Sequence, residues 1–344
     1  MSETIHIALS FNDPKGTYAR HAAVTMVSIF ENTSSPVCVH VLHDETLTQR
    51  NRAAFEELAA EYGQQMLFHD ITALFVENRA LLERMERLSK WSKGALFRLF
   101  LPEVCTDEKV IYLDCDIIAS LDIAELWKSD LGQKTVGVVP DWQSLYSLSG
   151  ASLTWRQKKI WSMWNIRDYE YFNSGVMLFD LGKLRREYDI FGALATFLEL
   201  NARFVMAPDQ DYLNWLFAED KTILGEKFNR KRTENITYDN CTGYLWHMMW
   251  KPWSGYEHPA LDDMYWKYLR KTPYCTTDEE LLRTVLKDLA GSYYMHRHTI
   301  SCLKRILKQL SENIFRVHII CLPFLLYCLL FHPDRSYRSC VRTS

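Results

Sequence analysis

The strongest constraint on the fold of this chain is the alternation of short apolar runs with segments of helical periodicity in its first half. Apolar runs at residues 5–11, 37–44 and 65–71 have the length and composition of strands. The intervening segments, 19–33 and 46–63, carry apolar residues at helical spacing. Near-continuous apolar strands separated by helices indicate a parallel sheet covered on both faces. Such sheets bind ligands beyond the carboxyl ends of their strands.

The pattern continues beyond residue 100 and then changes. From about residue 256 the chain turns toward helical segments. Before that point, strands are expected at 110–119, 135–141 and 172–181, helices at 186–201 and 209–218, and two closing segments of the sheet region at 221–229 and 242–250.

Composition removes several classes of protein. A net charge of −3 over 344 residues gives no case for nucleic acid as a partner. The nine cysteines are scattered without a C-x-x-C pair, so neither a disulfide framework nor a zinc site is expected, and reduced cytoplasmic thiols are favoured. The N-terminal residues lack the basic and apolar regions of a signal peptide.

The stretch VIYLDCDIIA, residues 110–119, places Asp114 and Asp116 two residues apart at the end of an apolar strand. Side chains alternate along a strand, so both carboxylates point the same way and repel unless a proton or a cation lies between them. Oxygen ligands suit Mn²⁺ or Mg²⁺, and a nucleotide diphosphate would supply more of them. The alternative is an acidic pair that only caps a turn or a following helix.

Four other segments carry polar residues at positions suited to a ligand site. Each lies at the start or end of an expected strand or helix, or inside an otherwise apolar helix. They contain Arg98 in GALFRLFLPE, Asn173 and Gly175 in FNSGVMLFDL, Asp209, Gln210 and Asp211 in APDQDYLN, and His247 and Lys251 in HMMWKPW.

In order and spacing, these segments resemble the family 8 retaining glycosyltransferases, which include bacterial lipopolysaccharide galactosyl- and glucosyltransferases and are related to glycogenin. The resemblance covers roughly residues 5–275 and rests on ALFRL, YLDCD, FNSGVMLFDL, DQDYLN and KPW together. It implies an α/β fold of the GT-A type, with a mostly parallel central sheet as the catalytic domain over 1–255. The change of pattern at about residue 256 predicts a helical C-terminal region over 256–344. The resemblance also implies a UDP-sugar donor, Mn²⁺ (or Mg²⁺) and retention of the anomeric configuration.

The resemblance assigns roles to particular residues. Asp114, Asp116 and His247 would hold the metal, with Asp114 also near the ribose or sugar hydroxyls. Lys251 would neutralise the leaving diphosphate, where charge grows as the bond breaks. Arg98 would reach the donor phosphate or sugar.

The transferred sugar and the nucleotide have their own expected contacts. Asn173, Asp209 and Gln210 would surround the sugar, with the Gln210 carbonyl oxygen stabilising an oxocarbenium-like centre. In the N-terminal loop, Asn12 and Asp13 stand where relatives show Asp-Asp-Asn, and Tyr18 aligns with a base-stacking aromatic residue.

The C-terminal residues 296–344 carry eight Lys or Arg and two acids, and the 13-residue apolar run 319–331 is too short to span a bilayer comfortably. Basic clusters flanking an apolar segment suit an anionic membrane surface. We therefore expect a cytoplasmic protein, peripheral on the inner face of the membrane, that acts on a saccharide or glycolipid acceptor. The alternative is a C-terminal helix packed in a groove of the same chain or of a partner subunit.

Two other functions compete with transfer of galactose or glucose in lipopolysaccharide or other surface-glycan synthesis. One is nucleotidyl transfer to a sugar phosphate, which favours a Gly-rich loop after the first strand, where NDPKGTY has one Gly. The other is binding of a UDP-sugar without catalysis. In the aromatic stretch 141–165, Trp155, Trp161 and Trp164 have a spacing that favours helix-core packing over stacking on sugars.

Overall fold

The computed structural model describes most of the first 275 residues. The described residues are 3–88, 93–141, 155–167, 169–231, 233, 235–248, 251–254, 258–275, 277 and 282. They belong almost wholly to one compact unit formed by residues 1–252 and 258–276. The predicted membrane-associating segment, 296–344, lies outside them.

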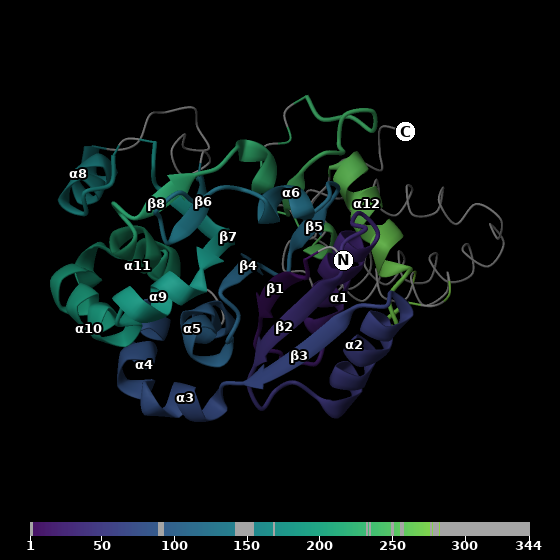
Figure 1. Ribbon diagram of the computed structural model, residues 1–344, viewed down its shortest axis with the longest axis horizontal. Coiled ribbons are helices and arrows are strands. Elements are labelled where there is room, and N and C mark those ends of the chain that lie inside the picture. The colour runs from purple at the N-terminus through teal and green to yellow at the C-terminus, as the bar shows by residue number, and fades with distance from the viewer. Residues whose placement is uncertain are drawn as a thin grey trace, which may run out of the picture. The chain divides into compact units, whose positions relative to one another are not determined.

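The elements of this unit alternate between strands and helices along the chain (Figure 1). The strands are β1 (Ile5–Ser10), β2 (Val37–His43), β3 (Gln65–Asp70), β4 (Lys109–Leu113), β5 (Ile117–Ala119), β6 (Val136–Pro140), β7 (Phe172–Asp180), β8 (Lys221–Ile223) and β9 (Leu245–His247). The helices are α1 (Ala19–Phe30), α2 (Gln49–Glu61), α3 (Thr72–Glu77), α4 (Arg79–Leu88), α5 (Leu101–Val104), α6 (Ala124–Trp127), α8 (Trp155–Met163), α9 (Leu181–Glu187), α10 (Ile190–Asn201), α11 (Pro208–Leu216) and α12 (Pro259–Leu269). Short 3₁₀ helices are η1 (Lys93–Phe100), η2 (Ala202–Phe204), η3 (Glu226–Phe228) and η4 (Pro252–Ser254).

The central sheet has seven strands in the order β3-β2-β1-β4-β7-β6-β8. Neighbouring strands are parallel except at β7, which runs antiparallel to both β4 and β6. The mostly parallel α/β sheet predicted from the sequence is therefore confirmed. Because β7 is reversed, its first residues lie at the same edge of the sheet as the carboxyl ends of β1, β2, β4 and β6.

A second, two-stranded sheet pairs β5 with β9 in antiparallel register, with Ile117 opposite His247. The expected strand 110–119 is thus two strands, and the two acids stand in the turn between them. The segment 242–250 contributes its strand to this small sheet rather than to the central one. Likewise, the helix expected at 186–201 is divided between α9 and α10, since the Asp189 side chain caps a new helix by accepting from the Gly192 amide.

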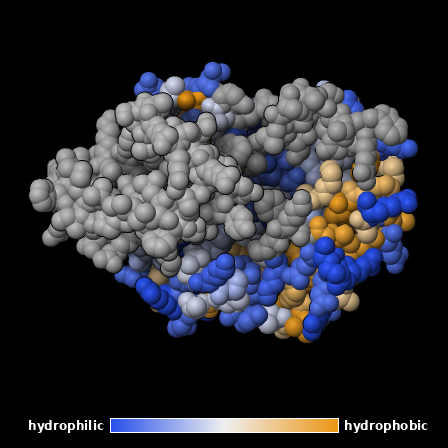
Figure 2. All heavy atoms as spheres, turned by 180° about the vertical axis from the view of Figure 1, so that it is seen from behind, coloured by the Kyte–Doolittle hydropathy of each residue, from blue (hydrophilic) through white to orange (hydrophobic). Residues whose placement is uncertain are grey.

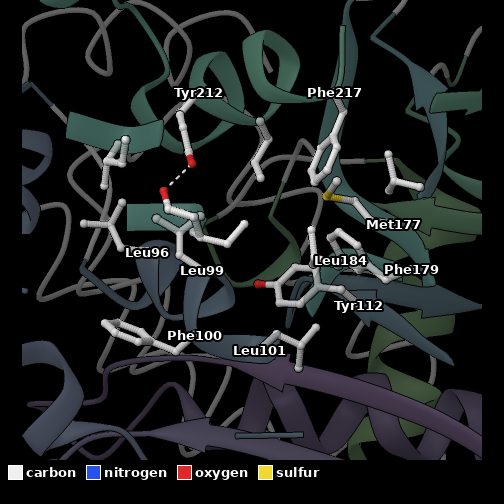
Figure 3. Close-up of a cluster of buried hydrophobic side chains, with 14 of the residues drawn as sticks. Leu96, Leu99, Phe100, Leu101, Tyr112, Met177, Phe179, Leu184, Tyr212 and Phe217 are labelled. Carbon is white, nitrogen blue, oxygen red and sulfur yellow. Dashed lines mark hydrogen bonds between the residues drawn. The ribbon is translucent and has the colours of Figure 1, made fainter. Parts of the chain in front are cut away.

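Both faces of the central sheet are buried, as alternating positions of β1 show: Ile7 and Leu9 on one face and Ala8 on the other are fully buried. On the Ala8 face, side chains from β4, β7, η1, α9 and α11 form one continuous apolar core, part of which Figure 3 shows around Tyr112, Met177 and Phe217. On another side of the unit, α1 packs against α12, where His21 Nδ1 lies 2.6 Å from the Tyr265 hydroxyl.

Two aromatic residues near the C-terminal end of α8 pack in the core. Trp161 stacks on Tyr171 with ring centroids 4.4 Å apart, and Trp164 donates its indole N–H to Asn201 over 2.8 Å. Both tryptophans are buried, so the prediction of core packing is confirmed for them. The side chain of Trp155 lies outside the described residues.

Figure 2 shows the opposite face of the molecule, where the described surface is mostly hydrophilic and a large apolar area lies on the side that holds α10 and α11 in Figure 1. Leu200 at the end of α10 and Met206 before α11 are among the exposed large apolar side chains. Within the described part of the chain, no helix is long and apolar enough to cross a bilayer.

The Asp220 carboxylate joins the end of the sheet to the helix that follows β7. It accepts hydrogen bonds from both the amide and the hydroxyl of Thr135, from Tyr188 over 2.7 Å and from Lys183 over 3.1 Å. Burial raises its pKa, but these hydrogen bonds outweigh burial and hold the pKa below its ordinary value.

Replacing Asp220 with Asn is expected to lower the free energy of unfolding at pH 7 by about 1–3 kcal/mol, because donors to the carboxylate lose a charged acceptor. A carboxylate with a depressed folded-state pKa stabilises the protein above its unfolded pKa of about 3.9 and loses that effect as pH falls through the folded value. The free energies of unfolding of the two proteins, measured with urea at pH 7 and at lower pH, should therefore become more alike as the pH falls. An equal difference at all pH values would contradict this role.

Candidate active site

Polar side chains from separate segments gather at the carboxyl edge of the central sheet. Asp114 follows β4, Asp141 follows β6 and Asn12 lies just beyond β1, while Asn173 and Ser174 begin the reversed strand β7. The Asp114 amide donates to the Gly175 carbonyl over 2.8 Å, which continues the β4–β7 ladder into the site. The fold thus places the predicted acidic pair and the start of β7 side by side.

Asp114 is the centre of a hydrogen-bonded group. Its Oδ1 accepts from Arg98 over 2.8 Å and from the Tyr112 hydroxyl over 3.1 Å. The buried Arg98 guanidinium also donates to the Ser174 carbonyl and lies 3.5 Å from Asp209 Oδ2. Burial raises the pKa of Asp114, but the positive charge of Arg98 and its other neighbours lower it below the ordinary value, so the group is a carboxylate at neutral pH.

His247 reaches the acidic pair from the second sheet. Its Nε2 lies 3.5 Å from Asp116 Oδ1 and 4.0 Å from Asp114 Oδ2. Its Nδ1 lies 3.2 Å from the Asn229 side-chain oxygen, an arrangement in which Nδ1–H donates to Asn229 and Nε2 keeps its lone pair toward the acids. Burial, with Lys231 nearby, lowers the pKa of His247 to about 4, so the imidazole is neutral.

These residues fit a divalent cation. Ligand atoms of Asp114, Asp116 and His247 all lie within 4.8 Å of one another. Asp116 Oδ1 is buried without a hydrogen-bond partner in the described part of the chain, which is costly unless a cation takes that position. A Cβ at Gly175 would stand 2.7 Å from Asp114 Oδ2 and 2.5 Å from His247 Cε1, so glycine there keeps the space beside these ligands open. Two carboxylates with one imidazole suit Mn²⁺.

Lys251 supplies positive charge beside this cluster. Its ammonium group forms an ion pair with Asp116 Oδ2. Burial lowers the pKa of Lys251 to about 8, against the opposing effect of Asp114. The ammonium is therefore protonated at neutral pH and lies where it can meet an anionic group bound at the acidic pair.

Asn173 and Gln210 hold each other in place next to Asp209. Asn173 Nδ2 donates to Gln210 Oε1 over 2.8 Å, and Ser174 Oγ donates to Asp209 Oδ2 over 3.3 Å. All three predicted sugar-site residues thus meet in one hydrogen-bonded group. Burial and the nearby Asp114 raise the pKa of Asp209, although Arg98 opposes them.

Several residues of this group had no sequence signal of their own. Gln210 Nε2 donates to the Tyr171 hydroxyl over 3.1 Å and to Asp141 Oδ2 over 3.3 Å, and Asp141 forms a buried ion pair with Lys231 at 3.1 Å. Asn229 links the two halves of the site, because it contacts His247 and also donates to Asn173 over 2.9 Å. Asp211 lies at a helix start, as the sequence predicted. Its carboxylate accepts hydrogen bonds from the Met206 and Ala207 amides and so fixes the start of α11.

The N-terminal loop contributes less directly. Asp13 is buried, and its carboxylate accepts from the backbone amides of Thr17, Tyr18 and Ala19, so it caps the start of α1. Asn12 donates to Asp44 over 2.9 Å. Tyr18 is 37% exposed as a residue, and its ring packs against Phe11 and His21. The nucleotide contacts of these three residues stay predictions.

Comparison with known proteins agrees with this geometry. The model of Glycosyl transferase family 8 matches residues 6–239, which is more than half of the chain. The chain belongs to this family and is therefore a glycosyltransferase.

Curated relatives extend over most of the chain. General stress protein A of Bacillus subtilis is 27% identical over 305 residues, covering 80% of this chain and 96% of the relative. A putative glycosyltransferase of Haemophilus influenzae is 23% identical and covers 91% and 89%. The probable galacturonosyltransferase-like 6 of Arabidopsis thaliana is 36% identical, over only 53% of this chain and 52% of its own length.

Solved structures confirm the GT-A fold. The galactosyltransferase LgtC, solved in complex with donor and acceptor sugar analogues, superposes with a TM-score of 0.61 at 24% identity, covering 81% of this chain and all of LgtC. The bifunctional glycosyltransferase WbbM superposes with the same TM-score at 19% identity, covering 83% of this chain and 52% of WbbM.

Proposed function

We propose that this chain transfers a hexose, galactose or glucose, from a UDP-sugar to a saccharide or glycolipid acceptor, with retention of configuration and with Mn²⁺ at Asp114, Asp116 and His247. The observation that carries the proposal is the position of Asp114. One of its oxygens faces His247 and the other accepts from Arg98, which in turn lies beside Asp209. A diphosphate-binding cluster and a group able to bind sugar hydroxyls are thereby joined through one carboxylate.

The chain's own residues divide the work of breaking the bond between the anomeric carbon and the diphosphate oxygen. A divalent cation at the acidic pair would neutralise the diphosphate. Lys251 stabilises the same growing negative charge, which is where electrostatic help matters most. Arg98 and Asp209 orient sugar hydroxyls, and Gln210, fixed by Asn173 and Tyr171, presents a preorganised amide dipole to the positive character that develops at the anomeric carbon.

Retention follows if the acceptor oxygen attacks from the side that the diphosphate leaves. The new carbon–oxygen bond then forms on the same face, and the acceptor proton passes to the departing phosphate. The Gln210 amide is uncharged and a poor nucleophile, so in this proposal it stabilises the anomeric centre without forming a covalent bond. A surface-glycan or lipopolysaccharide acceptor at the membrane is part of the proposal.

The experiment that tests this function measures UDP release. The full chain is incubated with UDP-galactose, UDP-glucose or UDP-galacturonate, with Mn²⁺ or with a chelator, and with a panel of oligosaccharide and glycolipid acceptors. UDP-galacturonate is included because of the plant relatives. We expect metal-dependent release with one of the two hexose donors and a product whose new linkage keeps the donor's anomeric configuration. Release of pyrophosphate from UTP and a sugar phosphate would instead support nucleotidyl transfer. Binding of the UDP-sugar without turnover would support a binding protein, and either outcome would contradict the proposal.

Changing Lys251 to Ala is expected to lower kcat by about 10²–10³-fold, because the lost charge acts mainly as the diphosphate departs. The KM for the UDP-sugar should change much less. The matched control is Lys227→Ala, which removes an exposed lysine paired with Glu125 and should leave both parameters unchanged. A change in KM alone would mean that Lys251 binds the donor equally in the ground state.

A further inference from the structure

A second cluster of metal-ligating side chains lies outside the glycosyltransferase site, between the first strands of the sheet and the loop before β4. His6 is on β1 and His40 on β2, and their side chains share one face of the sheet, since His40 is two residues beyond Cys38, the register partner of His6. Cys105 and Asp107 come from the loop between α5 and β4.

The ligand atoms form overlapping groups: those of His40, Cys105 and Asp107 all lie within 4.8 Å of one another, and so do those of His6, Cys38 and His40. His6 Nδ1 lies 3.1 Å from His40 Nε2 and 3.3 Å from Asp107 Oδ2. His40 Nε2 lies 3.3 Å from Asp107 Oδ2 and 4.0 Å from Cys105 Sγ, and Cys105 Sγ lies 3.3 Å from Asp107 Oδ2. No such convergence was expected from the scattered cysteines, because these residues are far apart along the chain.

These separations match the edges of a small coordination tetrahedron. Zinc binds His nitrogen and carboxylate oxygen at about 2.0–2.2 Å and thiolate sulfur at about 2.3 Å. The edge of a tetrahedron is about 1.6 times the centre-to-corner distance, so these bond lengths place neighbouring ligand atoms about 3.3–3.7 Å apart. The separations among His40, Cys105 and Asp107, and those of His6 from His40 and Asp107, bracket that range, so a cation beside His40 and Asp107 would bind all four groups once side-chain shifts bring His6 and Cys105 to it.

Neighbouring side chains orient the residues of this cluster. His69 on β3 stacks on His40 with ring centroids 5.2 Å apart, and its Nε2 lies 3.0 Å from His40 Nδ1. This contact leaves Nε2 of His40 as the atom that faces the cluster, as in metal sites whose histidines are oriented by a further group. The Arg185 guanidinium donates to the Cys105 carbonyl over 2.8 Å and to the Asp107 carbonyl over 3.2 Å, which fixes the loop that carries the other two ligands.

The cluster is also accessible. The side chains of His6 and Asp107 are 23% and 30% exposed, whereas that of His40 is 1% exposed. An ion can therefore enter from the solvent side, while the inner ligands exclude water.

We propose that His6, His40, Cys105 and Asp107 form a structural zinc site, separate from the cation site of the glycosyltransferase centre. Two imidazoles, a thiolate and a carboxylate favour Zn²⁺ over the hard cations Mn²⁺ and Mg²⁺. The ion joins β1 and β2 to the loop before β4, and so ties together the strands whose ends carry the donor-site residues.

The test uses the full chain carrying Asp116→Ala, which removes a ligand of the other cation site. After chelation and dialysis, Zn²⁺ is titrated against a competing chromogenic chelator, and the bound metal is counted by mass spectrometry. Co²⁺ serves as a spectroscopic probe, because a thiolate ligand produces a charge-transfer absorption band. We expect bound zinc, a thiolate–cobalt band and a raised Tm on zinc addition.

Adding Cys105→Ser to this background should abolish the band, remove one zinc equivalent and weaken zinc affinity by at least about tenfold. Cys241→Ser replaces another buried cysteine and is the matched control, which should keep all three signals. If Cys105→Ser does not fold, His6→Asn, at a partly exposed ligand, replaces it: zinc affinity should fall by at least about tenfold while the thiolate–cobalt band is kept. Unchanged zinc affinity in both ligand variants, or no thiolate–cobalt band in the parent, would show that the cluster is only a chain of hydrogen bonds.

Discussion

Asp116→Ala is expected to abolish measurable binding of Mn²⁺ at the glycosyltransferase centre and to lower kcat/KM by at least about 10³-fold. Asp116 carries the buried Oδ1 atom that has no hydrogen-bond partner among the described residues, and its other oxygen pairs with Lys251. Removing the carboxylate therefore takes away a metal ligand and also the partner that positions the lysine. Manganese binding, followed by its paramagnetic resonance signal, and donor-dependent UDP release measure the two effects.

The control for this variant is Asp130→Asn, at an exposed loop position where the carboxylate accepts only from the Gly132 amide among the bonds described. It should leave manganese affinity and turnover unchanged. If Asp116→Ala kept both manganese binding and sugar transfer, the assignment of this site would be wrong, and so would the proposed function.

Gly175→Ala has the second-largest expected effect, although it removes no functional group. The added Cβ would lie 2.5 Å from His247 Cε1 and 2.7 Å from Asp114 Oδ2, closer than such contacts are found. Because Gly175 is buried in the β4–β7 ladder, the backbone cannot easily move away, so the two ligands must separate. We expect manganese affinity to fall by about 10–100-fold, the usual cost of displacing groups that orient metal ligands, with a similar loss of kcat/KM.

Gly225→Ala is the matched glycine control. A Cβ there meets no atom within 4 Å, and its φ of −66° suits alanine. Thermal unfolding of both variants separates local displacement from loss of fold. If Gly175→Ala bound manganese as tightly as the parent, the open space beside the ligands would be incidental.

The central sheet was predictable because burial on both faces leaves a strong apolar signal in strands such as β2, whose residues are all buried. The acidic pair was recognisable because charge at the end of a buried strand needs compensation. The reversal of β7 was not predictable, since a buried strand shows the same apolar run in either direction. Asp13 illustrates another limit, because the sequence could not show that its carboxylate caps the start of α1 in addition to any contact with a nucleotide.

The residues that sequence reasoning missed act through contacts between distant segments. Asn229 and Lys231 precede no recognisable motif. The bridge between Arg230 and Trp246 brings this segment beside His247, and Lys231 reaches Asp141 at the end of β6. The His6–His40 contact likewise depends on strand register, which no local pattern encodes. Local patterns therefore identified candidate residues, while the orienting partners required the folded chain.

The pairing of β5 with β9 has a consequence for the proposed cation site. Asp114 and Asp116 lie in the turn that precedes β5, and His247 lies on β9. An ion bound by all three residues would therefore join the two strands of this small sheet. Because such coupling is reciprocal, interactions that stabilise the pairing of β5 with β9 also raise the affinity for the ion. Substitutions at Leu245 or Trp246, which lie beside the proposed ligand His247 on β9, would then change the metal concentration needed to fill the proposed site.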